Sequence, residues 1–169
     1  FLADYISFIG IDHFDEAMLT IEEVTTFTSC EFVVRDFFKA HPDRMLAQMI
    51  DWSKHHNPHL RRLSSEGSRP KLPWGAALSS FIADPTPLVP ILENLKSDPS
   101  DYVRRSVANN LNDISKSHPE WVLKIAADWK DHSIDTNHLI RHGLRTLLKA
   151  GNKQALGLIG IIPVSYTHL

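Results

Sequence analysis

The chain has 169 residues, of which 43% are hydrophobic and 22% are charged, and its formal net charge is −2. These values are ordinary for a globular domain that buries a sizeable core. The sequence also argues against a membrane protein, because no apolar run approaches the ~18 residues of a membrane helix. No secretory leader pattern is present. Cys30 is the single cysteine, which excludes an internal disulfide and is typical of a reducing compartment, so we expect a cytoplasmic protein.

Charge is distributed unevenly along the chain. Residues 1–51 contain ten acidic and three basic side chains, whereas residues 52–169 contain ten acidic and fifteen basic side chains. The segment 141–153 has four basic residues and no acid: Arg141, Arg145, Lys149 and Lys153. This excess permits a basic face for nucleic acid, although a solvated helix face is the more ordinary explanation of such a block.

Prolines divide the chain into short segments with helical periodicity. Five of them follow a histidine, asparagine or aspartate, at His41-Pro42, Asn57-Pro58, Asp84-Pro85, Asp98-Pro99 and His118-Pro119. Asparagine or aspartate before proline is typical of a helix N-cap followed by the first helical residue. Apolar residues then recur at helical spacing, in runs from Val103 to Ile114, Val122 to Trp129 and Ile140 to Leu148. With no strand or hairpin signal, the sequence predicts an all-α fold.

An apolar residue followed by arginine recurs at Val34-Arg35, Leu60-Arg61, Val103-Arg104 and Ile140-Arg141. The spacings of 26, 43 and 37 residues are near the length of helical-pair repeats. We therefore predict a solenoid in which one helix of each pair turns its apolar side to a shared core and aligns its arginines along a concave, basic surface. A helical bundle with coincidental arginines is the alternative.

The segment 61–74, RRLSSEGSRPKLPW, places one acid among several bases. On a helical wheel Glu66 falls off the core side, four residues after Arg62, so a surface ion pair worth ~0.3–0.5 kcal/mol is its ordinary explanation. Glu31 instead borders an apolar surface, where an acid needs a partner or a function. Trp74 ends a proline-rich basic loop, in which a large aromatic side chain can stay accessible.

Other conspicuous residues have ordinary explanations. Three tryptophans lie on apolar helix faces and are expected in the core: Trp52, Trp121 and Trp129. A metal site at His55, His56 and His59 is disfavoured, because Pro58 interrupts the helix between them and zinc needs three or four convergent ligands. Phosphate-loop, nucleophile-elbow and zinc-protease motifs are absent from the sequence, so we predict no metal and no cofactor.

Four longer stretches point to a family: FTSCEFVVRDFF (27–38), HLRRLSSEGSRPKLPW (59–74), DPSDYVRRSVANNLNDISKSHPE (98–120) and LIRHGLRTLLKAGNKQALGLIG (139–160). They resemble the AlkC-type DNA alkylation repair proteins, members of the HEAT-like-repeat DNA glycosylases that also include the AlkD type. The resemblance implies one HEAT-like repeat domain over residues 1–160 whose N-terminal portion is missing, as the first residue, Phe1, also indicates. Residues 161–169 do not match, and PVSYTHL is typical of a cloning scar, so we expect a non-native tail.

The resemblance implies a bacterial DNA repair enzyme that removes cationic N-alkylated bases, such as 3-methyladenine and 3-methylcytosine, by hydrolysis of the N-glycosidic bond. By motif, its catalytic carboxylates fall on Glu31 and Glu66, and its tryptophan falls on Trp74. A carboxylate stabilises an oxocarbenium-like sugar, a second one positions water, and an indole face attracts a cationic base. We leave open which glutamate has which role and whether the base leaves the helical stack.

Double-stranded DNA is the implied partner of a monomeric chain. Phosphate contacts are expected from the basic surface, at Arg61, Arg69, Lys71, Arg104, Arg105, Asn109, Arg141 and Arg145. A non-catalytic helical-repeat module that binds DNA or protein through the same face is the alternative function. A structural all-α domain without a ligand would explain the apolar periodicity, but not the placement of Glu66 and Trp74.

Overall fold

A computed structural model of the protein describes residues 2–161. Within this range the chain forms α-helices and one 3-10 helix and no strand, which confirms the all-α prediction. The first helices are α1 (Leu2–Gly10), α2 (Phe14–Thr25), α3 (Val33–Ala40), α4 (Pro42–Trp52), α5 (Pro58–Gly67) and α6 (Ser79–Ala83). They are followed by η1 (Thr86–Leu88), α7 (Val89–Leu95), α8 (Asp101–Ser115), α9 (Pro119–Trp129), α10 (Ile134–Gly143), α11 (Arg145–Lys149) and α12 (Lys153–Leu158). The predicted tail from residue 162 onward lies outside the described residues.

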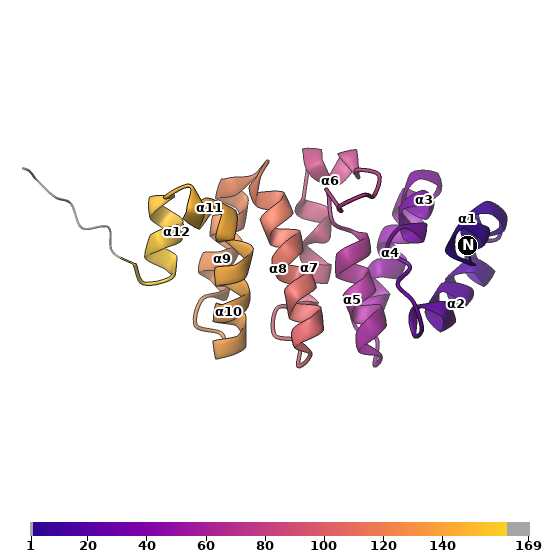
Figure 1. The fold of residues 1–169 in the computed structure, drawn as a ribbon, viewed down its shortest axis with the longest axis horizontal. Coiled ribbons are helices and arrows are strands. Elements are labelled where there is room, and N and C mark those ends of the chain that lie inside the picture. Colours follow the sequence, from indigo (N-terminus) through magenta and orange to yellow (C-terminus); the bar gives the residue numbers. More distant parts are fainter. Residues whose placement is uncertain (1, 162–169) are drawn as a thin grey trace, which may run out of the picture.

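The helices are stacked along the long axis of the molecule, from α1 at one end to α12 at the other (Figure 1). At the centre, α8 packs against α5 on one side and α10 on the other, and these three helices form a front row. Behind them, α4, α7 and α9 pack against the front row. Because each helix contacts mainly its neighbours along the stack, the fold is a helical-repeat solenoid, as predicted.

Three of the five predicted proline starts are helix starts in the structure: Pro42, Pro58 and Pro119 are the first residues of α4, α5 and α9. Asn57 caps α5, since its side chain accepts a hydrogen bond of 2.9 Å from the amide of His59. After Asp84 and Asp98 the chain first makes a turn, in which each aspartate accepts the amide two residues later. The next helices therefore begin at Thr86 and Asp101 rather than at the prolines.

The predicted helical run from Ile140 to Leu148 is divided, because α10 ends at Gly143 and α11 begins at Arg145. In a continuous helix the amide of Thr146 would donate to the carbonyl of His142. It donates instead to Oδ1 of Asn112 on α8, at 3.2 Å, and the His142 carbonyl accepts from Arg145. A side chain of the neighbouring helix thus replaces the backbone partner, and sequence periodicity contains no sign of it.

The solenoid repeats specific contacts as well as helices. At the start of α4, Nε2 of His41 lies 2.7 Å from the carbonyl of Ile11, and at the start of α9, His118 lies at the same distance from the carbonyl of Ile82. At the ends of the same two helices, Nε1 of Trp52 donates to Glu22, and Nε1 of Trp129 donates to Glu93. Equivalent anchors 77 residues apart therefore hold α4 and α9 to the preceding helix pair.

One continuous apolar core runs along the stack. The predicted stripe of α8 is buried, at Val103, Val107, Leu111 and Ile114. Trp52 and Trp129 are buried in this core as predicted, while Trp121 is only partly buried against it. No helix within residues 2–161 is long and apolar enough to cross a membrane.

The recurrent arginines do not form one surface row, and here the prediction is wrong. Arg35 is 1% exposed and lies inside the molecule. Arg61 and Arg104 each donate to the two carbonyls five and six residues earlier, and so fasten the loop that precedes their own helix. Only Arg141 is exposed. The recurrence is real, but at Arg61 and Arg104 it reflects a shared loop anchor rather than a shared ligand.

The hydrogen bond from Trp129 to Glu93 at the end of α9 should stabilise the fold, so we expect Trp129→Phe to lower stability. The substitution keeps the ring in the core but removes the N–H that donates to Glu93, so we expect a loss of about 1–3 kcal/mol in the free energy of unfolding, measured by urea denaturation.

The effect should depend on pH with a defined sign. Burial tends to raise the pKa of Glu93, but hydrogen bonds from Lys96 and Trp129 outweigh it and lower that pKa below its ordinary value of 4.5. A lowered pKa in the folded state contributes stability above the unfolded pKa, so the difference between wild type and variant should shrink as the pH falls below 4.5. Equal stabilities near pH 7 would contradict the anchor.

Candidate functional site

Glu66 occupies the C-terminal end of α5 and faces α8. It is 6% exposed, and its two oxygens accept hydrogen bonds from Nη1 of Arg69, at 2.5 Å, and from Oγ of Ser106, at 2.7 Å. The expectation that Glu66 lies on the surface is therefore wrong, because α8 covers that side of α5. A carboxylate this deeply buried is tolerated only when its lone pairs are occupied, and here both oxygens have donors.

Arg69 connects Glu66 to a second acid, Asp113 of α8. The Nε and Nη2 atoms of Arg69 lie 2.8 and 2.7 Å from Oδ2 of Asp113, and all three side chains are at least nine-tenths buried. Burial alone would lower the pKa of Arg69, but the two carboxylates outweigh it and raise that pKa. Sequence reasoning missed Asp113, because nothing in its spacing distinguishes it from a solvated acid near a helix end.

Glu31 lies in the turn before α3 and is joined to the same group through Arg62. Nη1 of Arg62 donates to Oε2 of Glu31 and to Oγ of Ser29, both at 2.6 Å. Nη2 of the same arginine lies 3.8 Å from Oε1 of Glu66, so the predicted Arg62–Glu66 pair exists but is longer than the pair with Arg69. Arg62 thus stands between the two glutamates, with the Tyr102 ring 5.2 Å from its charge.

Together these residues form a carboxylate–arginine chain: Glu31, Arg62, Glu66, Arg69 and Asp113. Acid and base alternate along it, so each carboxylate is oriented by a guanidinium. The Glu31 side chain is 16% exposed, whereas those of Glu66 and Asp113 are 8% and 3% exposed. Glu31 therefore marks the end of the chain that a ligand reaches most easily.

Trp74 lies on the loop that joins α5 to α6. The residue is 98% exposed, as the sequence predicts, and its backbone has φ of +59°, a left-handed conformation that is strained for a bulky residue. The loop itself is well anchored, because Leu72 is buried and the amide of Leu78 donates to the carbonyl of Pro70. A large aromatic ring is thus displayed on a fixed loop that begins next to the carboxylate–arginine chain.

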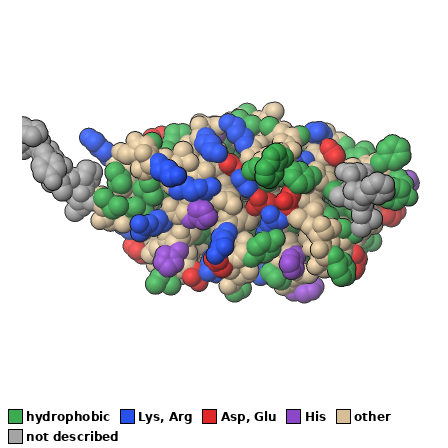
Figure 2. Space-filling model, viewed as in Figure 1, with side chains coloured by type: hydrophobic (Ala, Val, Ile, Leu, Met, Phe, Trp, Pro, Cys, Tyr) green, Lys and Arg blue, Asp and Glu red, His purple; other side chains and the backbone are tan. Residues whose placement is uncertain are grey.

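The residues expected to bind DNA fall into two groups in the structure. Lys71, Arg105 and Arg141 are exposed. Arg145 is half-buried and donates to Asn109 Oδ1 at 3.1 Å, and burial, together with the charge of Arg69, lowers its pKa even though Asp113 opposes this. Figure 2 shows Lys and Arg side chains gathered over the front row, mostly toward the α12 end, with acidic side chains near the middle.

The other group is used inside the fold. Arg61 forms a paired contact with Asp98, at 2.6 and 3.1 Å, besides its two carbonyl partners. Arg69 is enclosed between Glu66 and Asp113, and Arg104 lies 3.3 Å from Asp135. The expectation that these three arginines are free for phosphates does not fit their contacts, because their donors are already occupied by the protein.

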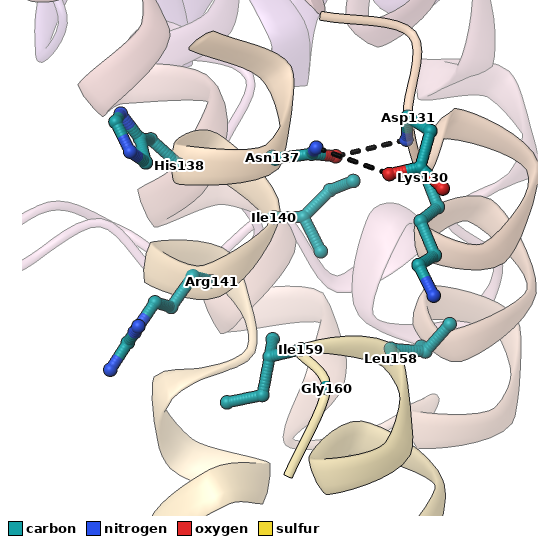
Figure 3. Close-up of a pocket in the computed structure, with 9 residues that line it drawn as sticks. All are labelled: Lys130, Asp131, Asn137, His138, Ile140, Arg141, Leu158, Ile159 and Gly160. Carbon is teal, nitrogen blue, oxygen red and sulfur yellow. Dashed lines mark hydrogen bonds between the residues drawn. The ribbon is translucent and has the colours of Figure 1, made fainter. Parts of the chain in front are cut away.

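A separate pocket lies between the start of α10 and the end of α12 (Figure 3). It encloses about 300 Å³, and Asn137 on one wall accepts a hydrogen bond from the amide of Asp131. Arg141 and His138 stand along one side, while Leu158 and Ile159 are on α12 and just after it. Because Asp131 is the only acid in its lining and is bonded to Asn137, the pocket lacks the convergent carboxylates of the α5–α8 site.

Comparison with known proteins connects this geometry to a family. The family model described as DNA alkylation repair enzyme matches residues 10–146. The protein YhaZ of Bacillus subtilis (strain 168) is 49% identical over 157 residues, which are 93% of this chain and 44% of YhaZ. The structure of Pseudomonas fluorescens alkylpurine DNA glycosylase AlkC, bound to DNA containing an abasic site analog, is 48% identical with a TM-score of 0.92, over 94% of this chain and 44% of AlkC.

The chain thus spans somewhat less than half the length of both relatives. The match with AlkC covers nearly all of the solenoid, so the stack of helices belongs to a shared architecture. The matched family model includes every residue of the carboxylate–arginine chain. The protein is therefore a member of the DNA alkylation repair enzyme family.

Proposed function

We propose that the chain is the catalytic part of a DNA glycosylase that hydrolyses the N-glycosidic bond of cationic N-alkylated bases, of the 3-methyladenine and 3-methylcytosine type. The observation that carries the proposal is the carboxylate–arginine chain, in which Glu31 and Glu66 share Arg62 and Glu66 directly precedes the loop that displays Trp74. The likeness to an alkylpurine DNA glycosylase supports the same reaction. The substrate is double-stranded DNA in the bacterial cytoplasm, and the chain acts as a monomer.

The proposed chemistry needs charge rather than a strong acid. An N3-alkylated base already carries a positive charge, so it leaves without protonation, and the sugar becomes an oxocarbenium-like cation. A carboxylate held in place beforehand stabilises that cation without reorganising. A second carboxylate positions and deprotonates the attacking water. Trp74 attracts the cationic base through its π face, an interaction worth about 0.5–2 kcal/mol.

The contacts suggest how the two glutamates divide this work. Both oxygens of Glu66 accept hydrogen bonds from the protein, which suits a fixed negative charge next to the sugar cation. For Glu31, hydrogen bonds from the described residues reach Oε2, which leaves Oε1 for a water molecule. We therefore assign the water to Glu31 and the electrostatic role to Glu66, with Asp113 orienting Arg69 behind it.

Glu31→Gln and Glu66→Gln test the two roles. Each change keeps the shape of the side chain but removes its charge, so we expect base release to slow by about 100- to 1000-fold, while binding of undamaged DNA persists. The measurement is single-turnover release of methylated base from methylated DNA, followed by mass spectrometry.

Glu120→Gln, at an exposed position of α9, is the matched control and should leave the rate unchanged. Circular dichroism of each variant separates a catalytic loss from unfolding. Full activity in both Glu31→Gln and Glu66→Gln would contradict the assignment. Wild-type protein that binds DNA but releases no base would support the alternative of a non-catalytic DNA-binding module.

Salt dependence tests the proposed DNA surface. Lys71→Ala, Arg105→Ala and Arg141→Ala each remove one exposed charge, so each should reduce the slope of log K against log salt by about 0.9, uniformly across DNA sequences. Fluorescence anisotropy at several salt concentrations measures the slope. Lys124→Ala, an exposed lysine of the rear helix α9, is the matched control. Slopes equal to that of the wild type in all three variants would exclude the basic front row as the DNA surface.

A further inference from the structure

Arg35 of α3 is buried but has only neutral partners among the described residues. It is 1% exposed. Its Nη1 donates to the carbonyls of Gly67, at 3.1 Å, and Arg69, at 2.9 Å, and its Nε donates to the carbonyl of Ala76. Its Nη2 is buried and meets no acceptor among these residues. One guanidinium thus joins both ends of the loop that carries Trp74.

A charge in this position is costly for the fold. Burial, together with the positive charge of Arg69, lowers the pKa of Arg35 to about 10, although Asp113 partly opposes this. A buried cation without a carboxylate beside it keeps most of its desolvation penalty, and an apolar side chain of similar size would fill the space without that penalty. Packing alone therefore does not account for an arginine here, whereas a need to hold three carbonyls does.

The loop from Gly67 to Ala76 packs tightly against the side chain of Arg35. A Cβ atom on Gly75 would lie 3.3 Å from Cδ and from Nε of Arg35 and 3.2 Å from Leu72, so the loop backbone rests directly on the arginine stem. Trp74, one residue earlier, has the strained φ of +59°. Backbone strain of this kind persists only where the surroundings determine the conformation, and the three carbonyl bonds of Arg35 are part of those surroundings, together with buried Leu72.

The indole of Trp74 depends on its backbone for position, because the residue is 98% exposed and little protein packs against it. The same guanidinium holds the backbone of Arg69, whose side chain orients Glu66 and Asp113. Arg35 therefore fixes the position of Trp74 relative to the acids Glu66 and Asp113, although it lies beneath the loop and the acids.

We propose that Arg35 is a positioning residue that clamps the loop from Gly67 to Ala76 and thereby sets the place of Trp74 relative to Glu66. The inference rests on the proposed glycosylase function for its catalytic consequence, but not for the clamp itself. Arg35 does not touch the reacting atoms, and acts only through the loop.

The test compares Arg35→Met with wild type in the 169-residue chain. Methionine fills much of the volume but donates no hydrogen bond, so the loop should loosen while the core stays folded. Trypsin reports on the loop, because Lys71 is exposed and the Lys71–Leu72 bond is cleavable, whereas Pro70 protects the bond after Arg69. We expect cleavage at Lys71 to be at least ~10-fold faster in the variant, at an unchanged melting temperature.

The catalytic consequence is measured separately. Single-turnover base release should fall about 10- to 100-fold in Arg35→Met, because a misplacement of about 1 Å costs that much, while affinity for undamaged DNA stays the same. Combining Arg35→Met with Trp74→Ala should be little worse than Trp74→Ala alone, since Arg69 keeps its side-chain contacts with Glu66 and Asp113 and the indole is what the loosened loop misplaces. Arg44→Met, which removes an exposed arginine of α4, is the matched control and should change neither reading.

Gly75→Ala provides a second route to the same loosened loop without altering Arg35, and it should also speed cleavage after Lys71 and slow base release. If trypsin cleaves Arg35→Met after Lys71 no faster than it cleaves the wild type, the proposed clamp is wrong. A faster cleavage with an unchanged rate of base release, or fully additive losses with Trp74→Ala, would overturn the positioning role. If the wild type releases no base while protection still depends on Arg35, the proposed function fails and the clamp stands.

Discussion

The buried ion triad of Glu66, Arg69 and Asp113 is the interaction on which the site depends. Helices usually pack on apolar side chains, but α5 and α8 add buried charges to theirs, together with bonds from Ser106 to Glu66 and from Asn110 to the carbonyl of Ser65. Buried ion pairs are weak sources of stability, because desolvation offsets much of the attraction. Their value lies in geometry: once one partner is in place, the others have a single satisfactory arrangement. The cost to the fold is justified if the carboxylates must keep one orientation while charge develops beside them.

Arginine serves three different purposes in this molecule, although its chemistry is the same in each. Arg61 and Arg104 bind the carbonyls of the loops that precede their helices, and so connect one repeat to the next. Arg62, Arg69 and Arg35 orient carboxylates and loop carbonyls around the site. Arg105 and Arg141 remain exposed. The planar guanidinium with several donors suits all three purposes, whereas lysine, a point charge on a flexible stem, would serve only the last.

The loop that carries Trp74 is not part of the repeating unit of the solenoid. Equivalent histidine and tryptophan anchors hold α4 and α9, and they recur because each helix pair faces the same packing problem. In the repeat, α4 and α5 correspond to α9 and α10. The long loop that follows α5 has no counterpart after α10, where α11 begins two residues later. The non-repeated loop therefore carries Trp74, and this is consistent with function residing in features that a regular scaffold positions. A rigid stack also keeps the exposed cations of α8 and α10 at fixed places relative to that loop.

Local chemistry by itself determined the helices, their apolar stripes and the accessible Trp74, whereas the choice of Glu31 and Glu66 came from the family resemblance and stays a prediction. These features depend on residues close in the chain: a proline after a cap, an apolar side chain every third or fourth position, a loop broken by prolines. Tertiary structure alone decided which charges are buried. Glu66 and Asp113 are 47 residues apart in sequence, and Arg35 lies 32 residues before Gly67, so only the crossing of α5 on α8 and the packing of α3 beneath the loop bring them together. A helical wheel finds the apolar side of one helix, but a polar residue at its border becomes buried or solvated according to which neighbour covers it.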